Sequence, residues 1–379
     1  MDNFKAFNPT FIHFGKDVIN ILGNKTKEFG TKALLIYGKG SIKENGIYNA
    51  VISQLKQAQI EVFEYSGIKS NPVFQDVDAA AEIAKQNDVD VIIAVGGGSV
   101  IDTSKMVAIT AKAEHSSWLF MLNKAQPKTA LPLICVLTLA ATGSEMNPYA
   151  VIQNDITKQK IGYGNPLLFP RYSFLDPTYT LSVPYNYTAY SITDIIAHCL
   201  EAYFGKGDSE LTDRIITAII KETMQKGLKL LKDLNNYELR ADIMLASTMA
   251  LNGITVYGKS FADWGVHSIG HELSSLYDTP HGASLSIAIP AWLKLHKNRI
   301  PERIKQLGSD LFDVDSTEKT ISEFENFFKS INSPLRLSDI ISDFNKNEII
   351  DQFRANKVTG SNYKLTDADY QALFEFMSK

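Results

Sequence analysis

Apolar and polar residues in the first half of the chain follow two alternating patterns. The predicted strands cover residues 32–37, 61–65 and 89–95, and the predicted helices cover residues 48–57 and 75–86. Residues 89–95 are almost continuously apolar, which is typical of a parallel strand covered on both faces. The alternation of strands and helices predicts a doubly wound α/β domain over residues 1–184.

The pattern changes after Pro184 to long stretches with helical spacing and few strand-like runs. The predicted helices cover residues 187–204, 210–231, 238–257 and 260–275. We therefore expect an all-α second domain over residues 185–379. Two domains also suit a chain of 379 residues, because domains typically contain roughly 100–200 residues.

Composition and charge narrow the class of protein. Hydrophobic residues make up 45% of the chain and charged residues 21%, as in ordinary globular proteins. The net charge of -4 and the absence of a dense basic run argue against nucleic acid as a partner. The N-terminus lacks the apolar core of a signal peptide, and the apolar run 131–141 is shorter than the ~20 residues of a membrane helix. We expect a soluble, cytoplasmic protein with reduced, buried Cys135 and Cys199.

A glycine-rich segment, Gly96-Gly97-Gly98-Ser99, follows the most apolar strand and precedes a helix-compatible run. Glycines let the backbone approach a ligand closely and adopt positive φ, and a helix N-terminus offers N–H groups to an anion. The pyrophosphate of a dinucleotide fits this description. A turn without a ligand is the alternative, since the segment matches neither the Rossmann fingerprint nor a Walker loop.

Two other segments have the character of cofactor-binding turns. Residues 138–145 follow the apolar run 131–137 and contain three hydroxyls among small residues, which can line a cofactor. Gly38-Lys39-Gly40-Ser41 follows the strand at 32–37, where many NAD enzymes place a carboxylate on the adenosine ribose. Glycine, lysine and serine can instead accept a 2′-phosphate, which favours NADP(H). A solvated turn is the alternative reading.

Histidines and one aspartate form a candidate metal site in the second half. Asp194 and His198 are four residues apart, as are His267 and His271, so each pair projects from one helix face; His281 follows. Four of the seven histidines therefore lie between 198 and 281. An imidazole-rich set with one carboxylate suits iron or zinc better than calcium or magnesium. A single Asp/His pair is more often a hydrogen bond, and spacing does not choose between His267 and His271.

The order and spacing of these segments resemble the iron-containing alcohol dehydrogenase family, especially its bacterial NADPH-dependent aldehyde reductases and butanol dehydrogenases. The resemblance extends from Phe14-Gly15 to the C-terminal region. It depends on residues 96–99 with Asp102 and Lys105, residues 142–145, Asp194 with His198, and residues 267–282.

The resemblance implies the site residues. It assigns Asp194, His198, His267 and His281 as metal ligands and places His271 beside the metal and substrate, where it assists proton transfer. The implied cofactor-binding residues are Gly38, Gly40, Ser41, Asn71, Gly97, Gly98, Ser99, Thr138, Thr142, Lys160 and Tyr179. NAD-preferring relatives carry an aspartate at the position of Gly38, so its absence favours NADP(H) over NAD(H). Two positions depart from the family pattern: Leu139 after Thr138 leaves one fewer hydroxyl for the cofactor, and Tyr179 occupies a site that is often leucine.

The implied activity is hydride transfer between NADP(H) and a small aldehyde or primary alcohol in the interdomain cleft of a homodimer. The alternatives on the same fold are glycerol dehydrogenase-like polyol oxidation and a dehydroquinate synthase-like lyase reaction. The phosphorylated substrate of the lyase calls for Lys/Arg near the metal motifs, but the segments flanking His198 and His267 are largely apolar. A noncatalytic NADP(H) sensor is a third reading, and the retained ligand positions argue against it. The sequence does not choose between iron and zinc.

Overall fold

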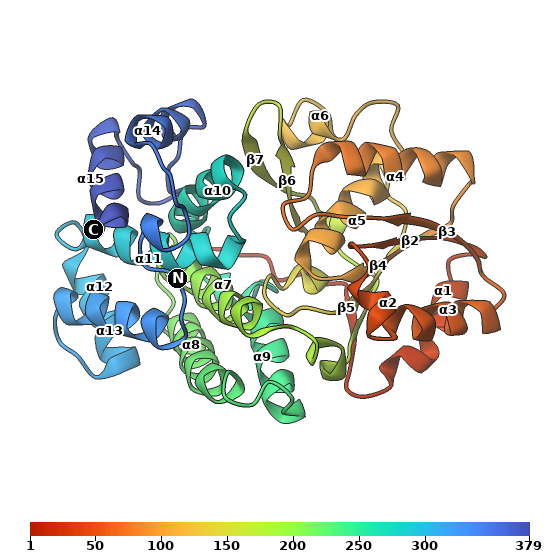
Figure 1. The fold of residues 1–379 in the computed structure, drawn as a ribbon, viewed down its shortest axis with the longest axis horizontal. Helices are drawn as coiled ribbons and strands as arrows, with labels where there is room; N and C mark the ends of the chain where they lie inside the picture. Colours follow the sequence, from red (N-terminus) through yellow and green to blue (C-terminus); the bar gives the residue numbers. More distant parts are fainter. The chain divides into compact units, whose positions relative to one another are not determined.

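A computed structural model describes residues 1–379, which form two compact units (Figure 1). One unit contains Phe7–Val183, and the other contains Met1–Ala6 with Pro184–Lys379. The first six residues, which the sequence pattern placed with the α/β domain, pack instead on the helical unit. The Asp2 N–H donates to the Gly258 carbonyl at 2.9 Å, and the Phe4 ring stacks on Tyr257 with centroids 5.3 Å apart.

A six-stranded parallel sheet forms the centre of the α/β unit. Its spatial order is β1 (Phe11–Phe14), β8 (Tyr172–Leu175), β5 (Leu133–Leu137), β4 (Val91–Gly96), β2 (Lys32–Tyr37) and β3 (Glu61–Ser66). Figure 1 shows α4 (Phe74–Gln86) and α5 (Gly98–Thr110) on one face, and α1 (Leu22–Lys27) and α3 (Ile47–Gln57) on the other. The central strands β2, β4 and β5 are buried because helices cover both faces. The predicted doubly wound α/β fold is confirmed.

The order of the strands creates a switch point in the sheet. The chain visits β2, β3 and β4 in turn, yet β2 lies between β3 and β4. Connections therefore leave β2 in one direction and β4 in the other. In open α/β sheets, ligands bind outside the carboxyl ends of the strands at such a point.

A two-stranded antiparallel sheet, β6 (Tyr149–Asn154) with β7 (Gln159–Gly164), was not expected from the sequence. Gly162 and Gly164 lie within β7, and glycine has low strand propensity, which weakens the local signal. The hairpin joins the rest of the unit through a bridge between Val73 and Gln153. Two short helices, α2 (Ser41–Glu44) and α6 (Trp118–Met121), complete the unit with 3₁₀ turns.

The second unit is all-α, as predicted. Its helices are α7 (Tyr185–Tyr203), α8 (Glu210–Leu230), α9 (Tyr237–Ala250), α10 (Gly265–Tyr277), α11 (His281–His296), α12 (Pro301–Phe312), α13 (Thr317–Ser330), α14 (Lys346–Ala355) and α15 (Asp367–Ser378). Helices α7 and α11 are buried along most of their length and form the centre of the unit. None of the helices combines the length and apolar character needed to cross a bilayer.

Two predicted helices have different bounds in the structure. The stretch predicted at 238–257 ends as α9 at Ala250, and Gly253 then adopts φ +105°, which a helix does not accommodate. The stretch predicted at 260–275 begins only at Gly265, because Trp264 adopts the left-handed conformation with φ +64°. Cys135 and Cys199 are free and buried, as expected, and burial raises the pKa of both thiols.

Candidate metal centre and cofactor-binding turns

Helix α7 carries the first two candidate ligands, Asp194 and His198. Both are buried, and their spacing of one helical turn places the His198 Nε2 atom 3.7 Å from the Asp194 Oδ1 atom. The residues between them, Ile195, Ile196 and Ala197, are fully buried, so the polar pair lies inside the helical unit. The pair predicted from local spacing therefore exists as a buried juxtaposition.

Two other helices bring imidazoles to the same carboxylate oxygen. The Nε2 atoms of His267 on α10 and His281 on α11 each lie 3.6 Å from Asp194 Oδ1. Asp194, His267 and His281 offer ligand atoms that all lie within 4.8 Å of one another. Three imidazoles from three helices thus converge on one carboxylate.

The separations in this cluster suit a shared cation. Distances of 3.6 and 3.7 Å exceed a normal hydrogen bond. They are close to the ~3.4 Å between ligand atoms on a tetrahedral ion with bonds of ~2.0–2.1 Å. Asp194 Oδ1 and His267 Nε2 are buried atoms without a hydrogen-bond partner. The donor set therefore fits a divalent first-row metal such as zinc or iron.

The electrostatics of the cluster distinguish its two buried histidines. Burial lowers the pKa of His198 to about 4, so its imidazole is neutral. Burial also acts to lower the pKa of His267, but the adjacent Asp194 and Glu201 carboxylates outweigh it and raise that pKa to about 9. A cation in the cluster would therefore take the place of the proton on His267.

His271 lies one helical turn after His267 but outside the group of three. Its ring centroid is 5.4 Å from that of His281 and 6.2 Å from that of His267. The side chain is half-buried, whereas His267 is buried. His271 thus borders the cluster from a more open position.

Sequence reasoning missed one residue of the cluster, Glu201. Its Oε1 atom accepts a hydrogen bond from the backbone N–H of His267 at 2.8 Å and lies 2.9 Å from His267 Nδ1. Glu201 is three residues after His198 and seven after Asp194, so all three share a face of α7. This helical spacing could have identified Glu201 from the sequence.

The three predicted cofactor-binding turns meet at the switch point of the sheet. Gly38 follows β2, Gly97 follows β4 and Thr138 follows β5, and these strands are neighbours. Tyr37 pairs in register with Val95, and Gly96 with Leu137. The carboxyl ends of parallel strands share one edge, so segments that are about 100 residues apart in sequence lie side by side there.

The glycines after β4 allow the start of α5 to pack closely against residues 139–142. A Cβ atom on Gly98 would lie 2.6 Å from Thr142 Oγ1, and one on Gly97 would lie 3.0 Å from the Leu139 Cβ. None of Gly96, Gly97 and Gly98 has a positive φ, so that part of the sequence-based expectation is wrong. The start of α5 approaches the 138–145 segment because side chains are absent there. The N–H groups of Val100 and Ile101 donate to the Gly97 carbonyl, whereas those of Gly98 and Ser99 have no acceptor within the helix, which suits an anion.

A buried polar network holds the hydroxyl-bearing segment on α5. Lys105 Nζ donates to Ser144 Oγ at 2.7 Å, to Asn147 Oδ1 at 3.0 Å and to the Tyr149 carbonyl at 2.6 Å. Asp102 accepts hydrogen bonds from Ser144 Oγ and from the Val151 N–H. Lys105 is fully buried, and burial lowers its pKa to about 8. These two residues of the resemblance motif therefore position the turn.

The remaining predicted cofactor residues fall into separate groups. Lys160 Nζ donates to Asn71 Oδ1 at 2.9 Å, and Ser99 Oγ donates to the Ser70 carbonyl at 2.5 Å, so residues 70–71 link the hairpin to α5.

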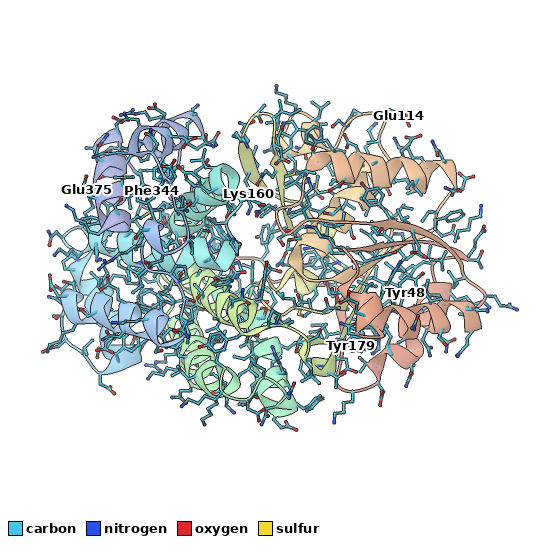
Figure 2. The ribbon with its side chains drawn as sticks, in the orientation of Figure 1. Tyr48, Glu114, Lys160, Tyr179, Phe344 and Glu375 are labelled. Atoms are coloured by element: carbon cyan, nitrogen blue, oxygen red, sulfur yellow. The ribbon has the colours of Figure 1, made fainter.

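Figure 2 shows Lys160 on the hairpin well apart from Tyr179, which lies in a 3₁₀ turn (Pro177–Thr180). Burial raises the pKa of Tyr179 to about 12, with Asp176 and Asp17 adding to the effect. Gly40 has φ +135° and precedes the exposed Ser41.

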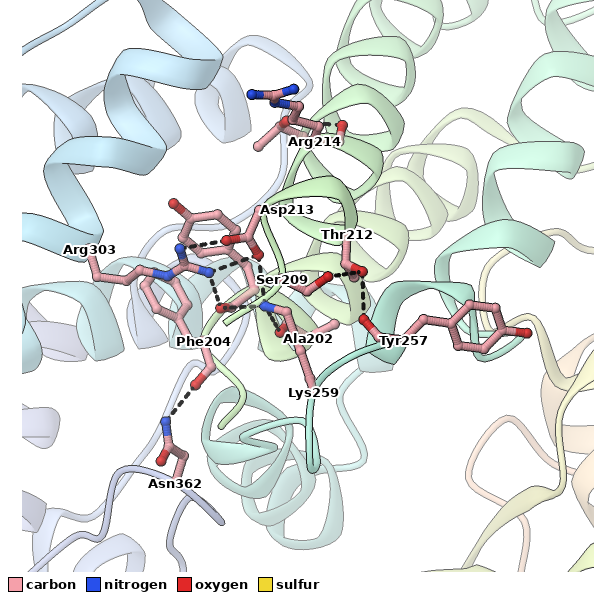
Figure 3. A network of polar contacts seen from close by, with 12 residues as sticks. Ala202, Phe204, Ser209, Thr212, Asp213, Arg214, Tyr257, Lys259, Arg303 and Asn362 are labelled. Atoms are coloured by element: carbon pink, nitrogen blue, oxygen red, sulfur yellow. Dashed lines mark hydrogen bonds and ion pairs between the residues drawn. The ribbon is translucent and has the colours of Figure 1, made fainter. Parts of the chain in front are cut away.

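A second polar network caps the C-terminal end of α7 (Figure 3). The buried Lys259 Nζ donates to the Ala202 carbonyl at 2.9 Å, to the Tyr203 carbonyl at 3.2 Å and to Asp213 at 2.8 Å. Arg303 makes two further bonds to Asp213 and lies 3.6 Å from the centre of the Tyr203 ring. The last carbonyls of a helix have no partner within it, so cations there satisfy them.

Replacing Lys259 with methionine is expected to lower the free energy of unfolding by about 3 kcal/mol, because it leaves buried acceptors without their donor. Arg303 still pairs with Asp213, which limits the loss. Chemical denaturation followed by circular dichroism measures the change. Lys305→Met is the control, since Lys305 forms an exposed pair with Glu302, and a change of under ~0.5 kcal/mol is expected. Equal effects of both substitutions would contradict the capping role.

Comparisons with known proteins agree with this architecture. Residues 9–177 match the family model "Iron-containing alcohol dehydrogenase", and residues 188–375 match "Fe-containing alcohol dehydrogenase family, C-terminal". A Bacillus subtilis protein called probable NADH-dependent butanol dehydrogenase 1 is 40% identical, with 99% of each chain covered. The NADPH-dependent aldehyde reductase YqhD of Escherichia coli is 33% identical over 89% of each chain.

A solved structure of a relative has the same fold. The crystal structure of NADH-dependent butanol dehydrogenase A from Thermotoga maritima superposes with a TM-score of 0.96 at 36% identity, covering 100% of this chain and 99% of the other. Likeness of this extent over both units, together with the two family models, identifies the family.

Proposed function

Since this chain belongs to the iron-containing alcohol dehydrogenase family, we propose that it transfers a hydride between NADP(H) and small aldehydes or primary alcohols, with one divalent iron or zinc ion. The observation that carries this proposal is the convergence of three imidazole Nε2 atoms on Asp194 Oδ1 at 3.6 and 3.7 Å.

The proposed ligands are Asp194, His198, His267 and His281. When bound, a divalent cation stabilises negative charge that develops on a substrate oxygen during hydride transfer. Helix α7 already holds the neutral His198 imidazole and the buried Asp194 carboxylate on one face. Neither side chain therefore has to move to bind the cation. His271, half-buried beside His281, is proposed to pass a proton to or from the substrate oxygen.

The proposed cofactor site is the switch point of the sheet. The first turn of α5, which begins at Gly98, offers N–H groups to the pyrophosphate. Gly38, at the end of β2, brings no carboxylate to the adenosine ribose, and Lys39 and Ser41 are exposed next to it. These features support NADP(H). Relatives differ in this property: the Bacillus subtilis protein is named NADH-dependent and the Escherichia coli protein NADPH-dependent. The local chemistry at Gly38 is therefore the basis of the proposal.

Small aldehydes and alcohols are the proposed substrates because relatives over nearly the whole chain are named butanol dehydrogenases and an aldehyde reductase.

The test is a turnover assay on purified protein that has been stripped of metal and reconstituted with Fe²⁺ or Zn²⁺. Butanal reduction is followed through oxidation of NADPH and, separately, of NADH. We expect activity only with metal, and a higher kcat/KM with NADPH. Absence of turnover with any metal and either cofactor, across aldehydes of different chain length, would contradict the proposed reaction.

A further inference from the structure

We propose that Glu201 is a positioning residue of the metal centre, which orients His267 so that its Nε2 atom faces Asp194. This inference rests on the metal-dependent function proposed above. Glu201 lies on α7 and His267 on α10, so the contact joins two helices of the same unit. Neither residue spacing nor the family resemblance assigned Glu201 a role.

The hydrogen bonds around Glu201 determine which nitrogen of His267 is available. Glu201 Oε1 lies 2.9 Å from His267 Nδ1, and an ionised carboxylate can only accept hydrogen bonds. Nδ1 is therefore the donor, and in the neutral imidazole Nε2 presents its lone pair. That Nε2 atom lies 3.6 Å from Asp194 Oδ1. The contact thus sets both the tautomer and the direction of the ring.

Glu201 also holds the backbone that carries His267. The same Oε1 atom accepts the backbone N–H of His267 at 2.8 Å, and the main-chain carbonyl of Glu201 accepts the N–H of Asp263 at 2.9 Å. Between these two anchors lies Trp264, whose φ of +64° is uncommon for a bulky residue. Two fixed points on α7 therefore define the turn that starts α10.

The Glu201 carboxylate also caps the N-terminus of α10, because His267 lies near the start of this helix. His267 lies in the first turn of the helix, where backbone N–H groups have no acceptor within the helix. A carboxylate at this end also interacts favourably with the helix dipole. Glu201 thus caps α10 from outside and orients a candidate ligand with a single oxygen atom.

A second buried glutamate provides a comparison. Glu272 lies on α10 and is buried to a similar degree, with 4% of its surface exposed against 2% for Glu201. Its carboxylate accepts hydrogen bonds from Gln352 and Asn356, and none of these bonds involves a candidate ligand. Removing Glu272 therefore tests the loss of a buried carboxylate without the loss of a contact to His267.

The experiment measures Zn²⁺ affinity by competition with a chromophoric chelator, and the absorption spectrum of the Co²⁺-substituted protein. Glu201→Ala is expected to weaken Zn²⁺ binding by about 10–100-fold and to alter the Co²⁺ bands, because outer hydrogen-bond partners of metal-binding histidines have effects of this size. Glu201→Gln keeps an oxygen that accepts both bonds, so it should retain the Co²⁺ spectrum and lose less affinity. Glu272→Ala should bind Zn²⁺ like the wild type.

Other outcomes separate this inference from the proposed function. If Glu201→Ala keeps wild-type Zn²⁺ affinity and spectrum while His267→Ala loses the metal, the role of Glu201 is wrong and the metal site stands. If His267→Ala also keeps the metal, the site itself is wrong. Should Glu201→Ala fail to fold, Glu201→Asp replaces it: the shorter side chain withdraws the carboxylate from Nδ1, and wild-type Zn²⁺ affinity in that variant overturns the inference.

Discussion

Replacing His267 with alanine is expected to remove metal and activity together. The substitution removes one of the three imidazoles that converge on the buried Asp194 Oδ1 atom. A cation bound there would therefore lose one of its few protein ligands. The loss of metal affinity should exceed the ~10–100-fold effect of losing an outer hydrogen-bond partner. Elemental analysis of the purified variant, alongside butanal reduction, measures both effects.

His271→Ala is the matched control, because this histidine lies one turn along the same helix. Its ring borders the cluster at 5.4 Å from that of His281 and is not among the three residues that offer mutually close ligand atoms. We expect the variant to keep its metal and to lose roughly 10²-fold or more in turnover, the range of general acid–base catalysis. A variant that loses metal while His267→Ala keeps it would reverse the two assignments. Full metal content in both would show that the site lies elsewhere.

Introducing a carboxylate with Gly38→Asp is expected to change the cofactor preference. A negative charge next to a 2′-phosphate is repelled by up to ~4 kcal/mol at 4 Å and an effective dielectric constant of 20, and solvent reduces this value. We therefore expect kcat/KM with NADPH to fall by about 10–100-fold, with activity on NADH maintained or increased. The backbone accommodates the side chain, because Gly38 lacks a positive φ and a Cβ atom there would lie 3.7 Å from the Ile68 carbonyl oxygen.

Gly38→Asn separates charge from size in this experiment. Asparagine has nearly the same shape as aspartate without the charge, so this variant should keep the preference for NADPH. Steady-state kinetics with both cofactors on all three proteins provide the comparison. An equal loss of both activities in Gly38→Asp would show that the ribose site is misplaced. A wild-type protein that prefers NADH would contradict the proposed NADP(H) preference directly.

Much of the fold could be predicted from local pattern. The strand at residues 32–37 has the same bounds in the structure, and the run at 89–95 corresponds to β4 (Val91–Gly96), because burial on both faces leaves a continuous apolar stretch in the sequence. The β6–β7 hairpin was missed, since glycines in β7 weaken its pattern. The start of α10 was placed several residues too early. The left-handed Trp264 lies between Asp263 and His267, whose N–H groups bond to Glu201 on α7, and the local sequence does not encode these contacts.

The candidate site also has features that the sequence predicted and features that only the tertiary structure revealed. By itself the sequence determined that Asp194 and His198 share a helix face and that glycine turns follow two apolar strands, since helix period and strand ends are local properties. Only the tertiary structure decided that His267 and His281 direct Nε2 at Asp194, and that Glu201 binds His267. It also showed that Gly98 accommodates Thr142. These contacts join residues on different helices and strands, and their distances depend on how those elements pack, which no local periodicity encodes.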